Sequence, residues 1–284
     1  MTRNVWRRFS SAAALSIMYA LMVLALVPLG LVLWFTASKG LPSVLHLEFF
    51  FNAERPTGIP GGGVANAIVG TGIMVGMASL AAIPIGVLSG IYLAEYRAAR
   101  WAGWVRLASD VLVGAPSIAL GIFAYAIIVV PQHHFSALSA SLALAILMLP
   151  VVIRTTESAV GLIPNGLRES GLALGLPRWR VSLELILPAA TPGVITGALL
   201  AVARASGETA PVLFTGFGNQ IFSLDPTHAM AALPLVVFRD ALTPYNDLQQ
   251  VAWGAALVLV VMVLVINLGS RWVLRRQIRL AGQL

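Results

Sequence analysis

Long apolar stretches alternate along the chain with short segments that hold nearly all of its charged residues. No charged side chain occurs in residues 9–38, 56–94, 111–153 or 248–270. A helix of about 20 apolar residues is long enough to cross the hydrocarbon core of a bilayer. The pattern therefore predicts an all-α, polytopic membrane protein, and the turn-forming residues between the stretches divide it into six transmembrane helices.

The six predicted helices cover approximately residues 12–36, 64–92, 107–130, 136–153, 192–217 and 248–268. The first apolar stretch is too long for the core of a signal peptide, so we expect it to be retained as a helix. Pro84 is expected to bend the second helix, and Pro116 lies inside the third. The apolar stretch 230–238 is too short to cross a membrane, and we expect a helix at the outer surface there.

Pairs of glycines four residues apart occur in two of the predicted helices, and such pairs let membrane helices approach closely. We expect a packing role for Gly72 and Gly76, Gly86 and Gly90, and Gly193 and Gly197.

Composition supports a membrane protein and excludes several kinds of chemistry. Hydrophobic residues make up 58% of the chain and charged residues 10%, against about 25% charged in ordinary soluble domains. The absence of cysteine excludes disulfides, thiolate metal sites and cysteine nucleophiles. The single lysine, Lys39, lies in Ser-Lys-Gly, whereas a phosphate-binding loop requires Gly-Lys-Ser/Thr. The histidines lack the spacing of a metal site, so we predict no catalytic residue, no metal and no cofactor in this chain.

The net charge of +7 has a better explanation than nucleic-acid binding. With the N-terminus in the cytoplasm, 14 of the positive residues fall on the cytoplasmic side, which is the positive-inside bias of membrane proteins. Both termini are therefore predicted to be cytoplasmic, and the chain contacts lipid rather than nucleic acid.

The longest predicted cytoplasmic segment, residues 154–187, contains signals for two short helices. Pro164 and Asn165 suit a helix start, and Gly175 suits the left-handed position after a helix end. Pro177 opens a second helix, and Pro188 is expected to help end it. A loop of this length between two spans is a natural place to look for function.

This segment resembles the EAA loop of ABC importer permeases, which reads Glu-Ala-Ala, three residues, Gly, nine residues, Ile-x-Leu-Pro. The corresponding residues are Glu169, Ser170, Gly171, Gly175, Leu185, Leu187 and Pro188. Small residues replace the alanines, leucine replaces isoleucine, and the spacing is intact. The alternative is a solvated amphipathic loop without a partner.

The resemblance implies the type I (MetI-like) architecture and a coupling helix that inserts into a groove on a separate ATP-binding subunit, which alone binds ATP. It assigns coupling to Arg168, Glu169, Ser170, Gly171 and Gly175. Arg168 and Glu169 are expected to supply polar anchoring at that joint, and the small residues to leave the helix backbone open to the partner.

Arg204 and Glu208 are the only charged residues deep within a predicted helix. Each costs about 2.5–3.5 kcal/mol at the centre of a membrane helix, and their spacing places them on one helix face. Two interpretations stay open. The residues neutralise each other inside the bundle, or Arg204 helps an anion cross while Glu208 holds the guanidinium or closes a gate.

Residues 203–211, Ala-Arg-Ala-Ser-Gly-Glu-Thr-Ala-Pro, resemble a stretch of the phosphate-specific (PstA) permease family, as does Tyr-Leu-Ala-Glu-Tyr at 92–96. The resemblance implies a translocation pathway that includes Arg204, Glu208 and Thr209. It also implies a bacterial inner-membrane location and three partners: a PstB-like ATP-binding subunit, a second, PstC-like permease subunit and an external PstS-like phosphate-binding protein.

We therefore expect an N-terminal helix and external segment over residues 1–60, the importer transmembrane domain over 61–272 and a basic cytoplasmic tail over 273–284. The predicted function is ATP-driven phosphate import by alternating access. The alternatives are an ABC permease for sulfate, molybdate or an organic solute, and an ion-coupled carrier that uses Glu208 as a proton site.

Overall fold

The structure is a computed structural model that describes residues 2–59, 61–97 and 99–281. Within these ranges the regular elements are all helices, as predicted. Five helices are long and apolar enough to cross a membrane, or six if one sharply bent pair counts as a single span. The predicted all-α membrane architecture is therefore confirmed.

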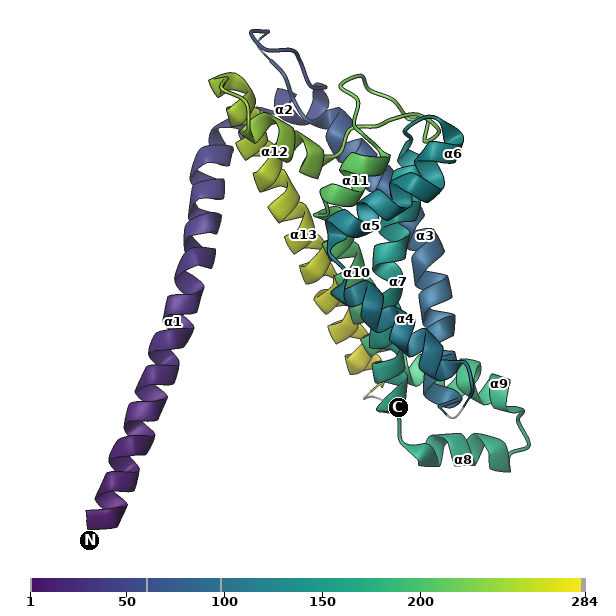
Figure 1. The fold of residues 1–284 in the computed structure, drawn as a ribbon. Helices are drawn as coiled ribbons and strands as arrows, with labels where there is room; N and C mark the ends of the chain where they lie inside the picture. The colour runs from purple at the N-terminus through teal and green to yellow at the C-terminus, as the bar shows by residue number, and fades with distance from the viewer. Residues whose placement is uncertain (1, 60, 98, 282–284) are drawn as a thin grey trace.

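The core of the bundle consists of three helices, α3 (Ala65–Glu95), α7 (Ala137–Gly161) and α10 (Leu187–Ser206). Helix α7 lies between the other two and contacts both (Figure 1). Its buried face carries mainly alanine and other small or aliphatic side chains, which pack against the buried residues of α3 and α10. Helix α7 continues eight residues past the predicted end at 153, so the cytoplasmic loop is shorter than expected.

Four of the six paired glycines explain how closely these helices pack. A Cβ atom on Gly90 of α3 would lie 2.6 Å from Thr156 Cβ, and one on Gly197 of α10 would lie 2.4 Å from Thr155 Cβ. Gly86 and Gly193 likewise lie against side chains of α7. At the remaining pair, Gly72 and Gly76, no other helix of the described residues comes within 4 Å of where a Cβ would lie, so the predicted packing role is wrong for this pair within the chain.

The predicted third span is broken. Helix α4 (Ala102–Gly114) meets α5 (Ser117–Ala124) at a bend of 109°, and a π-helical segment, η1 (Tyr125–Val129), leads into α6 (Val130–Gln132). The single helix predicted over 107–130 is therefore wrong. Pro116 has no N–H group to donate, and Ala115 before it is extended, with ψ of 137°, so the helical hydrogen bonds cannot continue through the bend.

The predicted fifth span begins earlier than expected and is also broken. Helix α9 (Arg178–Arg180) continues through the π-helical η2 (Val181–Ile186) into α10, so Pro188 does not end a helix. Pro188 is the second residue of α10 and follows the π-helical turn directly, so it lies inside a continuous helical segment. At its other end α10 stops at Ser206, and α11 (Ala210–Thr215) follows after three residues.

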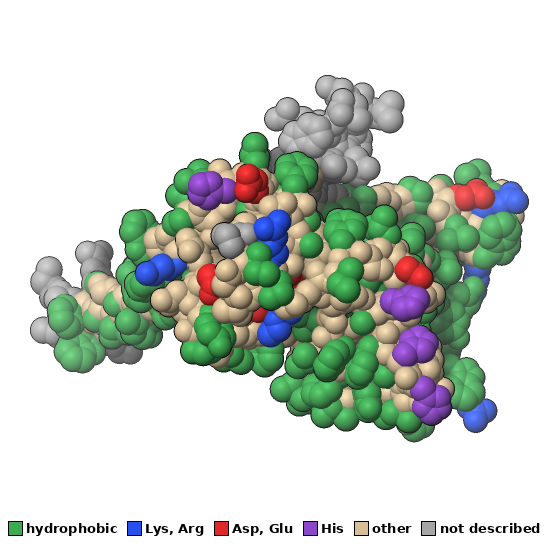
Figure 2. Space-filling view, turned by 90° about the horizontal axis from the view of Figure 1, so that it is seen from above, with side chains coloured by type: hydrophobic (Ala, Val, Ile, Leu, Met, Phe, Trp, Pro, Cys, Tyr) green, Lys and Arg blue, Asp and Glu red, His purple; other side chains and the backbone are tan. Residues whose placement is uncertain are grey.

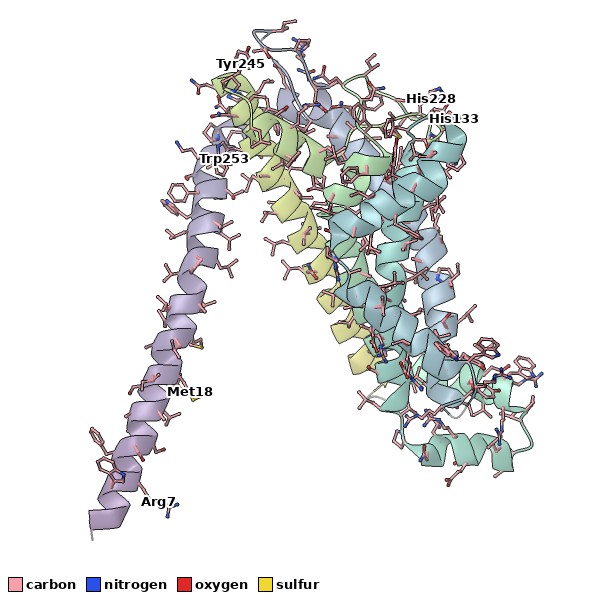
Figure 3. All side chains as sticks on the ribbon, in the orientation of Figure 1. Arg7, Met18, His133, His228, Tyr245 and Trp253 are labelled. Atoms are coloured by element: carbon pink, nitrogen blue, oxygen red, sulfur yellow. The ribbon has the colours of Figure 1, made fainter. Side chains whose placement is uncertain are left out.

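Helices α1 (Thr2–Val44) and α13 (Asn246–Ala281) converge at one end and diverge along their length (Figure 1). They meet where Gly40 lies against α13, since a Cβ there would be 2.5 Å from the Trp253 carbonyl oxygen. The Ser43 hydroxyl also donates to the Gln250 carbonyl at 3.1 Å. Figure 3 shows Trp253 beside this junction and Met18 far from the bundle. Helix α13 extends through most of the predicted basic tail, whose residues 282–284 lie outside the described residues.

Short helices cover the two ends of the bundle. Helices α2 (Glu48–Phe51) and α12 (Leu233–Ala241) lie at the end where α1 meets α13, and α8 (Asn165–Ala173) lies across the opposite end (Figure 1). The predicted helix near 230–238 is thus present, and it packs against α13 and α3 with Leu233 and Val236 buried. His133 and His228 lie at the α12 end, as expected for residues of outside loops (Figure 3).

Candidate functional site

Helix α8 begins and ends at the residues that the sequence predicts. Pro164 precedes its first turn, and Gly175 follows its end with φ of +79°. The Gly175 N–H donates to the Leu172 carbonyl at 2.9 Å, and the Leu176 N–H donates to the Gly171 carbonyl at 3.2 Å. These bonds satisfy carbonyl groups that a helix end leaves open, and the left-handed backbone at Gly175 makes them possible.

The predicted coupling residues of α8 do not all face the same way. Glu169 and Ser170 are exposed, whereas Gly171 is buried. A Cβ on Gly171 would lie 2.7 Å from Leu185 Cδ1 and 2.9 Å from Val181 Cγ2. The small residue at 171 therefore lets α8 pack against η2 of the same chain, and does not leave the backbone open to a partner as expected.

Arg168 also points into its own chain. Its Nε lies 2.9 Å from Glu95 Oε1, at the last residue of α3. Its terminal nitrogens donate to the carbonyl of Ile163 at 2.6 Å and to that of Val160 at 2.9 Å, at the end of α7. Both members of the ion pair are largely shielded, with 17% of the Arg168 side chain and 14% of the Glu95 side chain exposed. The anchoring expected of Arg168 is thus to α3 and α7.

A second group of charges joins α4 to α7 near the same end. Arg154 pairs with Asp110, and its Nη1 lies 3.2 Å from Glu157 Oε2. Arg106 pairs with the other Glu157 oxygen at 2.6 Å and donates to the Leu93 carbonyl of α3 at 2.8 Å. Glu95 and Asp110 thus both pair with arginines of other helices of this chain.

The predicted pathway residues lie together at the break between α10 and α11. Arg204 is in the last turn of α10, where the negative end of the helix dipole favours a cation. Its Nε lies 3.3 Å from Glu208 Oε1. The Glu208 side chain is 16% exposed and that of Arg204 is 42% exposed. Of the three side-chain nitrogens of Arg204, only Nε has a hydrogen-bond partner among the described residues.

Thr209 stands between Glu208 and the first residue of α11, and its carbonyl accepts from the Leu213 N–H at 2.9 Å. Helix α11 packs against α5, the helix that follows the other break. Gly121 permits this approach, because a Cβ there would lie 3.0 Å from the Pro211 Cα. The two broken spans therefore meet beside the Arg204–Glu208 pair.

A buried charged cluster at the opposite end from α8 was missed by sequence reasoning. Arg239 of α12 pairs with Glu54, and its Nε lies 2.7 Å from Asp240 Oδ1. The side chains of Glu54 and Asp240 are 3% and 2% exposed. Asn66 Nδ2 donates to Glu54 Oε1 at 3.0 Å, which joins the cluster to the first turn of α3. The sequence shows that Arg239 and Asp240 are adjacent. It does not show that Glu54 is buried, because this depends on how the loop between α2 and α3 folds.

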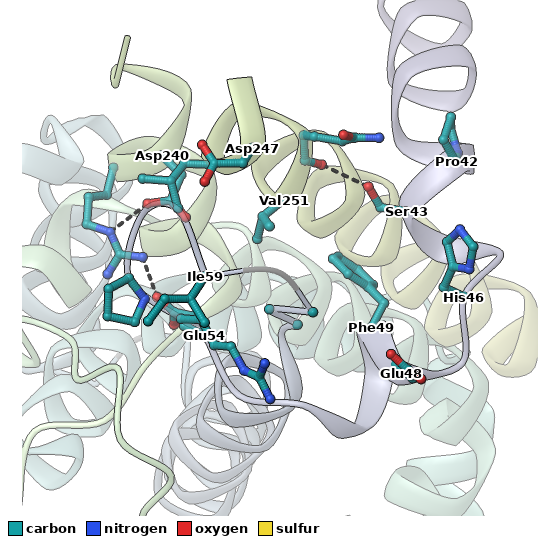
Figure 4. Close-up of a pocket in the computed structure, with 18 residues that line it drawn as sticks. Pro42, Ser43, His46, Glu48, Phe49, Glu54, Ile59, Asp240, Asp247 and Val251 are labelled. Carbon is teal, nitrogen blue, oxygen red and sulfur yellow. Dashed lines mark hydrogen bonds and ion pairs between the residues drawn. The ribbon is translucent and has the colours of Figure 1, made fainter. Parts of the chain in front are cut away.

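Two cavities border this cluster, and both are lined by Glu54 and Arg239. One has a volume of about 390 Å³ and lies between α2, residues 54–59 and 61–63, and the start of α13 (Figure 4). The other, of about 480 Å³, lies between α12 and the loop after α11. Lys/Arg and Asp/Glu side chains mix on this end of the molecule, so it is no purely cationic surface (Figure 2).

Burial and hydrogen bonding act against each other on the pKa values of Glu54 and Arg239. Burial raises the pKa of Glu54, and the hydrogen bond and charge of Arg239 oppose this shift only in part. Burial lowers the pKa of Arg239, but hydrogen bonds to Asp240 and Glu54 outweigh burial and raise it above its usual range. Arg239 therefore stays charged.

Comparisons with known proteins agree with this architecture. The family model of binding-protein-dependent transport system inner membrane components matches residues 82–279. The phosphate transport system permease protein PstA of Yersinia pestis is 41% identical over 270 residues, which cover 95% of this chain and 91% of that protein. The phosphate transport system permease protein PstA 1 of Mycobacterium tuberculosis is 37% identical over 283 residues, which cover 96% of this chain and 91% of that protein.

Solved structures share the fold at lower sequence identity. An inward-facing MetNI methionine ABC transporter has a TM-score of 0.59 at 20% identity, covering 75% of this chain and 93% of the matched chain. An amino acid ABC transporter has a TM-score of 0.52 at 16% identity, covering 75% of this chain and 92% of the matched chain. The expected MetI-like architecture is confirmed.

Proposed function

Because this chain belongs to the family of binding-protein-dependent transport system inner membrane components, we propose that it is the permease subunit of an ATP-driven importer of inorganic phosphate. The observation that carries the substrate is the likeness to phosphate permeases along nearly the whole chain. The Gly-Glu-Thr-Ala-Pro segment at 207–211 lies at a broken helix, where a passage would need polar groups.

Arg204 supplies the charge that a phosphate dianion requires in a low-dielectric passage. Its Nε is engaged by Glu208, which holds the guanidinium in place. Within the described part of the chain its terminal nitrogens have no acceptor, so they are available to two phosphate oxygens. The exposed side of Arg204 faces out of this chain, so the passage is completed by a second permease subunit.

The energy for transport comes from ATP hydrolysis by a partner subunit, because this chain has no Gly-Lys-Ser/Thr loop to bind ATP. The ATP-binding subunit contacts α8 at the exposed residues Glu169 and Ser170. An external phosphate-binding protein delivers the anion at the α12 end. The arginine distribution favours cytoplasmic termini, and the likeness to bacterial phosphate permeases favours a bacterial inner membrane.

Reconstitution of the permease pair, the ATP-binding subunit and the binding protein into vesicles tests this function. We expect phosphate uptake that requires ATP and every component, with sulfate and molybdate taken up far more slowly. Preferred uptake of another solute would assign the complex to a different importer. Uptake by this chain alone, driven by a proton gradient, would make it an ion-coupled carrier.

A further inference from the structure

Besides the hydrogen bonds from Arg168 to carbonyls at the end of α7, helix α8 makes two further kinds of contact with its own chain. The first is the packing of Gly171 against Val181 and Leu185, which belong to the same cytoplasmic segment. The second is the Arg168–Glu95 ion pair, which reaches a different membrane helix, α3. Of these two contacts, only the ion pair joins residues far apart in the sequence, since Arg168 and Glu95 are 73 residues apart.

Helix α3 connects the two ends of the molecule. Its 31 residues correspond to a length of about 45 Å. Glu95 is its last residue, and Asn66 lies in its first turn. Asn66 is 4% exposed, and its Nδ2 donates to Glu54 and to the carbonyls of Asn219 at 3.3 Å and Gln220 at 3.1 Å. One helix therefore holds the coupling helix at one end and the external charged cluster at the other.

Arg168 is held at three points of its own chain. Its guanidinium donates to one carboxylate and two backbone carbonyls of its own chain. This arrangement places the cation at the carbonyl end of α7, where it also interacts favourably with the helix dipole. A displacement of α8 therefore pulls on the ends of α3 and α7 through short, shielded contacts.

We infer that Glu95 and Arg168 are positioning residues that tie the coupling helix to α3, so that motion imposed on α8 moves α3 and the external cluster around Asn66. The inference rests on the proposed function, because it assumes a partner that moves α8. The pair touches neither ATP nor the transported anion. Its role is to keep transport coupled to ATP hydrolysis.

The test is the ratio of phosphate uptake to ATP hydrolysis in vesicles containing the complete complex. We expect Glu95→Gln to assemble and hydrolyse ATP, with uptake per ATP lowered roughly 2- to 30-fold, the range for single residues on a coupling route. Glu95→Asp keeps the carboxylate and should recover part of the ratio. Glu184→Gln is the matched control, because it breaks an exposed ion pair, with Arg180, in the same cytoplasmic segment.

An unchanged ratio in Glu95→Gln would overturn the inference. Failure of that variant to assemble would also overturn it, because the pair would then be needed for assembly and not for coupling. Equal losses in the Glu184→Gln control would show that any charge change in the segment has the same effect, which again rejects a special role for Glu95.

A distance measurement tests the same inference without any transported solute. The chain has no cysteine, so spin labels can be placed on cysteines at Leu88 of α3 and Leu174 beside α8, which are 60% and 81% exposed. We expect the same label distance with and without ATP in the otherwise wild-type complex, and a change on ATP addition with Glu95→Gln. A change in label distance on ATP addition in both complexes, or in neither, would contradict the inference. Absence of phosphate uptake by the wild-type complex would refute the proposed function and leave this measurement valid.

Discussion

Three arginines of this chain differ in what their surroundings leave them able to do. Arg168 has donors engaged by one carboxylate and two carbonyls of its own chain, so it serves as an internal anchor. Arg239 is held between Glu54 and Asp240. Arg204 is nearly half exposed and bonded through Nε alone within the described residues. Of the three, Arg204 is best placed to contact an anion.

Replacement of Arg204 by glutamine should abolish most phosphate uptake while the complex still assembles. Loss of a charged hydrogen-bond donor to the anion costs about 1.5–3 kcal/mol, which corresponds to a roughly 10- to 150-fold fall in uptake. Labelled phosphate uptake and co-purification measure the two effects. Arg180→Gln is the control, because Arg180 and Glu184 form a pair with the same spacing and the same 3.3 Å separation on the cytoplasmic segment. Normal uptake in the Arg204→Gln complex would leave Arg204 with only a structural role.

Glu54 should make the stability of the protein depend on pH. Its pKa is raised above 4.5 by burial, so the folded state holds the proton more tightly than the unfolded state. The free energy of unfolding is therefore expected to fall as the pH rises from 4.5 through the raised pKa of Glu54. Glu54→Gln cannot titrate and should lose this part of the pH dependence. Melting temperatures of both proteins in detergent across that range give the comparison, and identical pH profiles would show that Glu54 does not contribute.

At the scale of helices, the sequence predicts the number and order of the spans but not the two breaks. Charge-free stretches determine where helices cross, because an unpaired charge in lipid is costly. Pro116 was recognised in the sequence, yet a proline can bend a helix or end it. The outcome depends on the packing of α5 against α11, and these segments are far apart in the sequence.

Side-chain partners show the same limit. The helix carrying Glu169 was located by its caps and spacing, which are local properties of the sequence. The partner of Arg168 lies 73 residues away, and only the fold shows that Gly171 faces inward while Glu169 faces outward. The Glu54 cluster was missed for this reason too, because its members come from a loop, α3 and α12.

A bulky residue at Gly171 should weaken the complex by displacing α8 within its own chain. Gly171→Leu places a side chain where Leu185 and Val181 already lie, and overpacking of this kind costs about 1–3 kcal/mol. We expect less ATP-binding subunit to co-purify and uptake to fall in proportion. Gly103→Leu is the control, since a Cβ on the exposed Gly103 of α4 would meet nothing within 4 Å. Unchanged co-purification with Gly171→Leu would show that α8 docks independently of this packing.

The whole molecule has two chemically different ends, and their orientation in the membrane can be measured. Cysteines at Thr227, in the exposed loop near α12, and at Leu174, beside α8, are suitable because the chain has none of its own. In intact cells an impermeant thiol reagent should label the Thr227 position and spare the Leu174 position, and opened membranes should allow both to react. The reverse pattern in intact cells would invert the assigned topology.

Helix α1 meets α13 around Gly40 and Ser43, and the most apolar part of α1 has none of its residues buried by the rest of the chain. Its entry into the bilayer during synthesis therefore relies on its own hydropathy, and the later helices are not needed to shelter it. Insertion of the leading helix and assembly of the bundle are thus separable steps in biogenesis. The contact of α1 with α13 around Gly40 is where the leading helix joins the assembled bundle.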